Sequence, residues 1–251
     1  MASSSGVAGR WFHQLGSPKW FYQKSANWLP WLWAITAILF AFGLYYSLYA
    51  SPVDYQQGNS VRIMYIHVPA AALSMVGYLA MAICAIIGLV WKMKMSFMAM
   101  RAIAPIGAAF TFMCLFTGAL WGIPTWGTWW EWDARMTSEL VLLFLYLGFI
   151  ALHSSFADRN KADRSAAILA IVGAINVPII YGSVKWWNTL HQAYSVTKKG
   201  AIDPNMQTPL FIMIGAFYLL FAILVIVRLR LEIINREAKA KWLQQEVLGA
   251  S

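Results

Sequence analysis

The sequence predicts an all-α integral membrane protein with six transmembrane helices. Two observations carry this prediction: 60% of the 251 residues are hydrophobic, and only 12% are charged. A soluble domain of this length could not cover so much apolar side chain, and such a composition is typical of membrane proteins. A third observation is that apolar runs of about 20 residues, long enough to cross a bilayer core, recur along the chain. We therefore expect one membrane domain over residues 1–251.

Six apolar runs define the expected spans in the lipid bilayer. They lie near residues 28–49, 66–91, 102–121, 136–157, 165–184 and 207–228. A proline falls in or close to the first turn of four runs, where its missing N–H costs nothing. These prolines are Pro30, Pro69, Pro105 and Pro209. Asn176 and Pro178 predict a kink near the outer end of the fifth span.

The segments outside the spans are short, and their charge is asymmetric. Residues 1–27 form a polar and basic N-terminal segment, and residues 229–251 form a helix-prone C-terminal tail. Both termini and the even-numbered loops share one side of the membrane, which holds 14 of the 19 lysines and arginines. By the positive-inside rule this side, with both termini, is expected to be cytoplasmic. The net charge of +9 is thus a topology signal, and no nucleic-acid partner is expected.

This topology places two of the four histidines on the outer face. His67 lies at the outer end of the second span, and His191 lies in the loop between spans five and six. His13 belongs to the N-terminal segment. His153 is 18 residues beyond Arg135, roughly 27 Å deeper along the fourth helix at 1.5 Å per residue. Only His67 and His191 can therefore meet at one outer site.

The outer loop between spans three and four is rich in tryptophan. Five of the 14 tryptophans fall within 12 residues, and they are Trp121, Trp126, Trp129, Trp130 and Trp132. An aromatic belt would spread its tryptophans over many helix ends, whereas these are packed into one loop. Gly122, Pro124 and Gly127 are expected to break regular helix there.

A short helix over residues 126–133 would turn one face of the loop into a plate for a flat apolar ligand. The residues on that face would be Trp126, Trp129, Trp130 and Asp133. Asp133 is also a candidate N-cap of the fourth helix, a role that is compatible with a site. The alternative interpretations are an aromatic belt for the tryptophans and, for each histidine taken alone, a polar residue at the interface.

A planar apolar ligand held by two imidazoles points to haem. Neutral histidine is a common axial ligand of haem iron, and indole rings can cover the porphyrin. Arg62 and Arg135 are the candidates for the two haem propionates, because a guanidinium can bind a carboxylate through two hydrogen bonds. The hypothesis is that His67 and His191 hold the iron from above and below the ring.

Absent motifs narrow the function further. The chain has no C-x-x-C-H for covalent attachment, so we expect haem b that is held non-covalently and can be transferred. No P-loop motif occurs, so ATP hydrolysis by a P-loop is not expected. Cys84 and Cys114 form no C-x-x-C pair and are interpreted as small buried hydrophobes. Together these features favour a platform for haem handover over a conventional enzyme.

The pattern W-G-x-x-W-x-W-D in the outer loop resembles a known family signature. It is met by Trp126, Gly127, Trp130, Trp132 and Asp133. With the run WGIPTWGTWWEWDARMTSELVLLFLYLG and six spans, the chain resembles the WWD family of haem-handling membrane proteins, and within it the CcmC family of cytochrome c maturation. The resemblance implies that this loop and two histidines, matching His67 and His191, hold haem at the periplasmic face of the bacterial inner membrane.

The resemblance also implies partners. Proteins of this kind load haem onto the chaperone CcmE and work with the small membrane protein CcmD, while the ABC-type CcmA and CcmB power release of the loaded chaperone. Three other functions stay open on the residues alone. They are a transmembrane haem transporter, a b-type haem anchor of a respiratory enzyme, and a structural protein whose outer loops dock partners.

Overall fold

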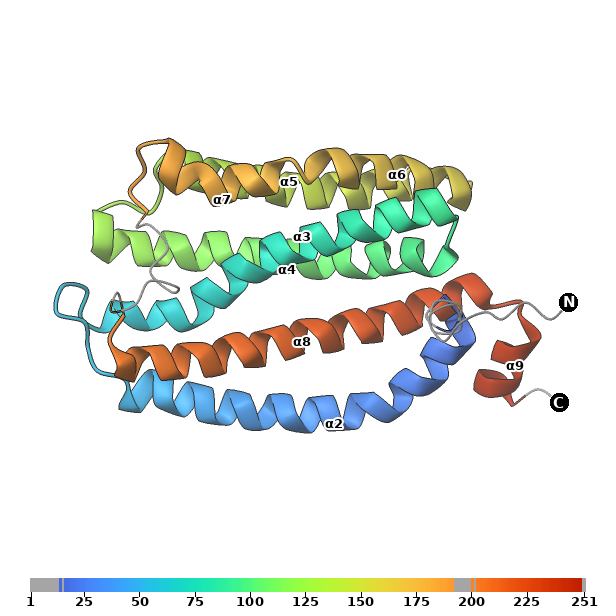
Figure 1. The fold of residues 1–251 in the computed structure, drawn as a ribbon, viewed down its shortest axis with the longest axis horizontal. Helices are drawn as coiled ribbons and strands as arrows, with labels where there is room; N and C mark the ends of the chain where they lie inside the picture. The colour runs from blue at the N-terminus through green and yellow to red at the C-terminus, as the bar shows by residue number, and fades with distance from the viewer. Residues whose placement is uncertain (1–13, 15, 192–199, 201, 250–251) are drawn as a thin grey trace, which may run out of the picture.

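The structure, a computed structural model, describes residues 14, 16–191, 200 and 202–249 and is built from long helices (Figure 1). Within these residues, six helical segments are long and apolar enough to cross a membrane. They are Pro18–Ala50, Asn59–Trp91, Lys94–Trp126, Ala134–Ser154, Arg159–Trp186 and Pro204–Glu237. The predicted all-α class and its six spans are confirmed. His13 lies outside the described residues.

Several of these segments consist of two helical elements. The first joins α2 (Pro18–Tyr45) to the π-helical turn η1 (Tyr46–Ala50), and the second joins the 3₁₀ turn η2 (Asn59–Ile63) to α3 (Met64–Trp91). The next elements are α4 (Lys94–Trp126), α5 (Ala134–Ser154), α6 (Arg159–Gly173) and α7 (Asn176–Trp186). The chain ends with α8 (Pro204–Glu237) and the short α9 (Lys241–Leu248).

The helices form three layers (Figure 1). α3 and α4 lie in the middle, with α5, α6 and α7 on one side and α8 and α2 on the other. α2 begins and α8 ends at the same end of the bundle, which we call the terminal end. At the opposite end, the loop end, α4 and α7 finish and α3 and α8 start. The tryptophan-rich loop between the third and fourth spans is therefore at the loop end.

Helix boundaries differ from the predicted ones. The first helix begins at Pro18 and not near residue 28, and α8 continues to Glu237, well into the predicted tail. The prolines expected at helix starts lie inside helices, and they are Pro30, Pro69, Pro105 and Pro209. Pro18 and Pro204 occupy first-turn positions instead. Interior prolines are tolerated in membrane helices because neighbouring groups satisfy the carbonyls that they free.

The fifth span is interrupted, as its Asn and Pro residues predicted. α6 ends at Gly173, α7 begins at Asn176, and the two residues between them make hydrogen bonds to residues three positions back. Asn176 Nδ2 donates a hydrogen bond to the Ser138 carbonyl on α5, 2.9 Å away. The interruption thus lies just before Asn176 and is fixed by a contact with the neighbouring helix.

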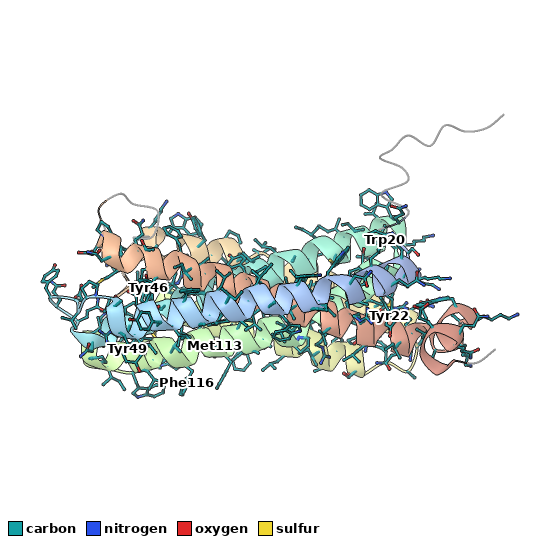
Figure 2. All side chains as sticks on the ribbon, turned by 90° about the horizontal axis from the view of Figure 1, so that it is seen from below. Trp20, Tyr22, Tyr46, Tyr49, Met113 and Phe116 are labelled. Atoms are coloured by element: carbon teal, nitrogen blue, oxygen red, sulfur yellow. The ribbon has the colours of Figure 1, made fainter. Side chains whose placement is uncertain are left out.

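Aromatic side chains mark both ends of the bundle. Tyr46 and Tyr49 lie toward the loop end, and Trp20 and Tyr22 lie toward the terminal end (Figure 2). Such amphipathic rings suit the two interfaces of a bilayer. At the terminal end, the guanidinium carbon of Arg230 lies 3.9 Å from the centre of the Tyr22 ring, which links the last long helix to the first.

The centre of the bundle is closed by a buried tyrosine. Tyr146 on α5 is fully buried, donates a hydrogen bond to the Ser74 carbonyl on α3 (2.8 Å), and packs edge-on against Tyr78. Gly107 on α4 makes room for its ring, because a Cβ built there would lie 2.3 Å from Tyr146 Cζ. Three helices can therefore approach one another around one side chain.

This packing predicts that Gly107→Ala destabilises the fold by overpacking, by about 1–3 kcal/mol. The matched control is Gly215→Ala in α8, where an added Cβ meets no atom within 4 Å. Both changes gain the same helix propensity, so the difference isolates the contact with Tyr146. We expect a lower midpoint of thermal unfolding in detergent for Gly107→Ala only. Equal midpoints for the two variants would contradict the packing argument.

Candidate functional site

A cavity at the loop end contains both of the outer histidines. Its empty volume is roughly 680 Å³, counting the part that opens to solvent. It is lined by Gln57, His67, Val68, Gly118, Trp121, Thr125, Trp126 and His191. We call this the histidine pocket. The structure therefore brings together the two histidines that the topology assigned to one face.

His67, in the first turns of α3, is oriented by α4. Its Nδ1 lies 3.1 Å from Thr117 Oγ1, and the Thr117 hydroxyl donates its hydrogen to the Met113 carbonyl at 2.6 Å. Because that hydrogen is already used, we assign the His67 Nδ1–H as donor to the Thr117 oxygen. Nε2 then keeps its lone pair in the neutral ring and can bind a metal.

Gly118 forms the wall behind the His67 ring. A Cβ built at Gly118 would lie 2.9 Å from His67 Cε1, which is closer than side chains approach. The glycine thus lets the imidazole lie close to α4. A larger residue would push the ring toward the cavity or away from Thr117.

His191 is oriented in the same way by a carboxylate. Its Nδ1 lies 3.2 Å from Asp133 Oδ2, and a carboxylate can only accept, so Nδ1 carries the hydrogen. Nε2 is again the nitrogen that keeps a lone pair in the neutral ring. A histidine whose second nitrogen donates to a carboxylate is a common arrangement for a metal ligand.

Asp133 also fixes the chain around His191. Its side chain caps α5 by accepting from the Met136 N–H at 2.8 Å, so the predicted N-cap is confirmed. The other carboxylate oxygen accepts from the Thr189 hydroxyl and from the Leu190 N–H, the latter at 3.3 Å. Burial would raise the pKa of the Asp133 carboxyl, yet hydrogen bonds from His191, Met136 and Thr189 hold that pKa well below its usual value.

The tryptophan-rich loop differs from the predicted geometry. α4 continues through Trp126, so Gly122 and Pro124 lie inside it and do not break it. Gly127 does end the helix, since its φ of 79° is in the left-handed region that favours glycine. Residues 127–133 are not helical. The suggested short helix over residues 126–133, with one tryptophan face, is therefore wrong. Trp126 belongs to the last turn of α4, and the chain leaves the helical conformation at Gly127.

The five tryptophans divide into two groups. Trp121 and Trp126 line the histidine pocket, with ring centres 5.7 Å from His67 and 4.7 Å from His191 respectively. The other group consists of Trp129, Trp130 and Trp132, which contact one another in sequence. Trp129 and Trp132 are 63% and 72% exposed and are not among the residues that line the pocket. The loop thus presents one indole surface to the pocket and another to the outside.

The two candidate arginines lie in different surroundings. Arg135 lines a smaller cavity that also contains both histidines, and its Nη1 donates to the Ile180 carbonyl at 2.9 Å. Arg62, in η2, donates to the Ser51 carbonyl at 3.2 Å and does not line either of these two cavities. Arg135 is therefore the better placed of the two for a ligand held between the histidines.

Several residues at the site were not found from the sequence. Gln57 lines the histidine pocket and accepts a hydrogen bond from Trp121 Nε1 at 2.8 Å. Glu139 is buried in the smaller cavity, and neither of its carboxylate oxygens has a hydrogen-bond partner among the described residues. A carboxyl inside a predicted span was the available signal for Glu139. Thr117, Thr189 and Gly118 carry no sequence signal, because their roles depend on tertiary contacts.

Comparison with known proteins shows the family to which the chain is related. Residues 11–244 match the family model described as CcmC, Heme exporter protein C. The chain belongs to this family. It is 51% identical over 236 residues to the Heme exporter protein C of Escherichia coli (strain K12), which covers 94% of this chain and 96% of that one.

Other members of the family are similar over nearly the same length. The chain is 48% identical over 237 residues to Heme exporter protein C of Haemophilus influenzae, covering 94% of this chain and 96% of the relative. It is 50% identical over 233 residues to that of Bradyrhizobium diazoefficiens, covering 92% and 88%. The resemblance to the CcmC family that the tryptophan motif indicated is thereby confirmed, as is a multi-pass membrane protein.

The contacts of Asp133 predict a specific effect of Asp133→Asn in this CcmC-family chain. Asparagine still caps a helix, but it loses the charged acceptor of His191 and Thr189, at a cost of about 1–3 kcal/mol. The matched control is Asp158→Asn at the exposed start of α6, which caps through Asn160 only. We expect a clearly lower thermal unfolding midpoint for Asp133→Asn and a small change for Asp158→Asn.

The pH dependence of this effect follows from the lowered pKa of Asp133. A depressed carboxyl pKa contributes stability that is fully present above the unfolded-state value of about 4 and is lost as the pH falls further. The gap between wild type and Asp133→Asn is therefore expected to persist at neutral pH and to narrow below about pH 4. A gap that widens on acidification would contradict this account.

Proposed function

We propose that this protein holds haem non-covalently in the histidine pocket and delivers it to the haem chaperone CcmE. His67 and His191 would be the axial ligands of the iron, through the two Nε2 atoms that keep lone pairs. The observation that carries the proposal is that two imidazoles, each oriented through Nδ1 by another side chain, line one cavity together with two tryptophans. Haem b is the cargo here and not a permanent electron-transfer centre.

The other candidate residues have distinct roles in this proposal. Trp121 and Trp126 would cover the porphyrin by apolar contact, and Gly127 would hold the turn that follows Trp126. Arg135 would bind a propionate, since it lines a cavity with both histidines. Arg62 would have to leave the Ser51 carbonyl to bind the second propionate.

Handover requires that haem can leave and that a partner can reach it. No C-x-x-C-H motif binds the haem covalently, so coordination and packing alone would retain it. The exposed indoles of Trp129 and Trp132, both in contact with Trp130, are available to a partner that approaches from outside. We propose that this partner is CcmE, at the periplasmic face of the bacterial inner membrane, with both termini of the chain in the cytoplasm.

The proposed assembly extends beyond CcmE. The relatives are named as heme exporter proteins, and we propose that the chain works with CcmD and with the ABC-type subunits CcmA and CcmB. The ABC-type subunits would supply the ATP hydrolysis, for which this chain has no P-loop motif. Within the assembly the chain would be the haem-holding platform.

Transport of haem across the bilayer is the second candidate function, and Glu139 is the observation that favours it. This buried carboxyl lies in the smaller cavity with both histidines, within a membrane-spanning helix, where ionisable groups often mark a translocation path. Haem flux in proteoliposomes that depends on Glu139 would favour transport. Haem binding without flux would favour the handover platform.

Replacement of either proposed ligand is expected to remove most of the bound haem. His67→Ala and His191→Ala should each lower haem content on purification in detergent by at least about tenfold, because one axial bond is lost. The matched control is His153→Gln at the terminal end, which keeps a hydrogen-bond donor for Asp163. Soret absorbance per protein is the measurement. Wild-type haem content and spectra in both alanine variants would remove the basis of the proposal.

Gly118→Ala tests the geometry of the pocket without removing a ligand. The added Cβ would displace the His67 ring, so we expect the haem that remains to show a shifted Soret band and weaker retention. Gly148→Ala is the control, since its nearest neighbour would be 3.9 Å from the new Cβ. An unchanged spectrum in Gly118→Ala would show that His67 does not bind iron from its position in the structure.

A further inference from the structure

A separate cavity lies at the terminal end, remote from the histidine pocket. It lies between α4, α5 and α8 and has an empty volume of roughly 470 Å³, counting the part that opens to solvent. Three apolar residues, Pro105, Phe149 and Ile150, form part of its wall. The rest of the wall is polar or charged. Nothing in the proposed handover of haem uses this cavity.

On α4 and α5, the polar and apolar residues of this cavity are ordered along the membrane normal. On α4, which leaves the terminal end, Arg101 comes one turn before Pro105. On α5, which arrives there, Phe149 comes one turn before His153. Both helices therefore place the polar residue about 6 Å nearer the terminal end than the apolar one. A wall of this kind suits an amphiphile whose polar head lies at the interface and whose tail lies deeper.

Most of the charges around the cavity are already paired. Arg101 Nη1 lies 3.1 Å from Glu232 Oε2, and these two charges offset each other. His153 Nε2 lies 3.0 Å from Asp163 Oδ1, and Asp163 in turn pairs with Arg236 at 2.6 Å. The remaining polar groups thus bring no uncompensated negative charge to the cavity.

Arg228 on α8 is the exception. It lines the cavity one turn deeper than Glu232, it is exposed, and among the described residues it has neither a hydrogen bond nor an ion pair. Arginine inside a membrane-spanning helix is costly unless it finds an anion or reaches the interface. The cavity therefore has one cation without a counter-charge, beside an apolar wall.

We propose that this cavity binds the headgroup phosphate of an anionic phospholipid. Arg228, whose long side chain can extend toward the interface, would contact the phosphate, and Pro105, Phe149 and Ile150 would contact the start of the acyl chain. Basic pockets between transmembrane helices on the cytoplasmic side are known places for anionic headgroups. Bound there, the lipid would bridge α4, α5 and α8 and stabilise the terminal end of the bundle.

The test is lipid binding by the full chain in detergent, followed by native mass spectrometry. The probes are phosphatidylglycerol, phosphatidylcholine and inorganic phosphate. Arg228→Gln should weaken phosphatidylglycerol binding about fivefold, the effect of one cation near a membrane surface. Arg228→Lys should restore most of it. The matched control is Arg164→Gln, which removes one exposed arginine near the same end, outside this cavity, and should bind like wild type.

Three results would overturn the proposal. They are equal binding of phosphatidylglycerol and phosphatidylcholine by wild type, equal weakening by Arg228→Gln and Arg164→Gln, and full displacement of the lipid by millimolar inorganic phosphate, which would assign the site to free phosphate. Retention of the wild-type elution volume and haem content by Arg228→Gln excludes misfolding as the cause of weaker binding. The outcome does not depend on which protein receives the haem.

Discussion

The carboxylate of Asp133 is the interaction on which the geometry of the histidine pocket depends. One of its oxygens caps the start of α5, and the other accepts hydrogen bonds from the Thr189 hydroxyl, the Leu190 N–H and the Nδ1–H of His191. A single side chain therefore joins the tryptophan loop, the start of one membrane helix and one of the two imidazoles.

The two histidines are held by different means. His67 belongs to a helix of the central layer, is backed by Gly118 and bonds to a threonine of the next helix. His191 belongs to a connection and bonds to a charged group. Under the proposed function, an axial bond to His191 would be the easier of the two to exchange, because none of residues 187–191 belongs to a helix.

Much of the architecture and the outline of the site could be predicted from the sequence, because both follow from one-dimensional signals. Apolar runs gave the six spans, and counting charges assigned His67 and His191 to one face. The ends of helices could not be predicted as well, since α2 and α8 extend into polar segments that pack against each other and interior prolines are tolerated. The division of the tryptophans, and the roles of Thr117, Gly118 and Gln57, arise only when α3, α4 and the η2 region come together.

The interruption between α6 and α7 divides the fifth span into two helices that are held separately. α7 has 11 residues, about 16 Å at 1.5 Å per residue, and the connection with His191 follows its far end. α6 packs against α3 and α5, whereas α7 packs chiefly against α5. Arg135 donates a hydrogen bond to the Ile180 carbonyl, near the middle of α7. The start of α5 therefore holds the route to His191 at two points: Arg135 binds α7, and Asp133 binds Leu190 and the imidazole itself.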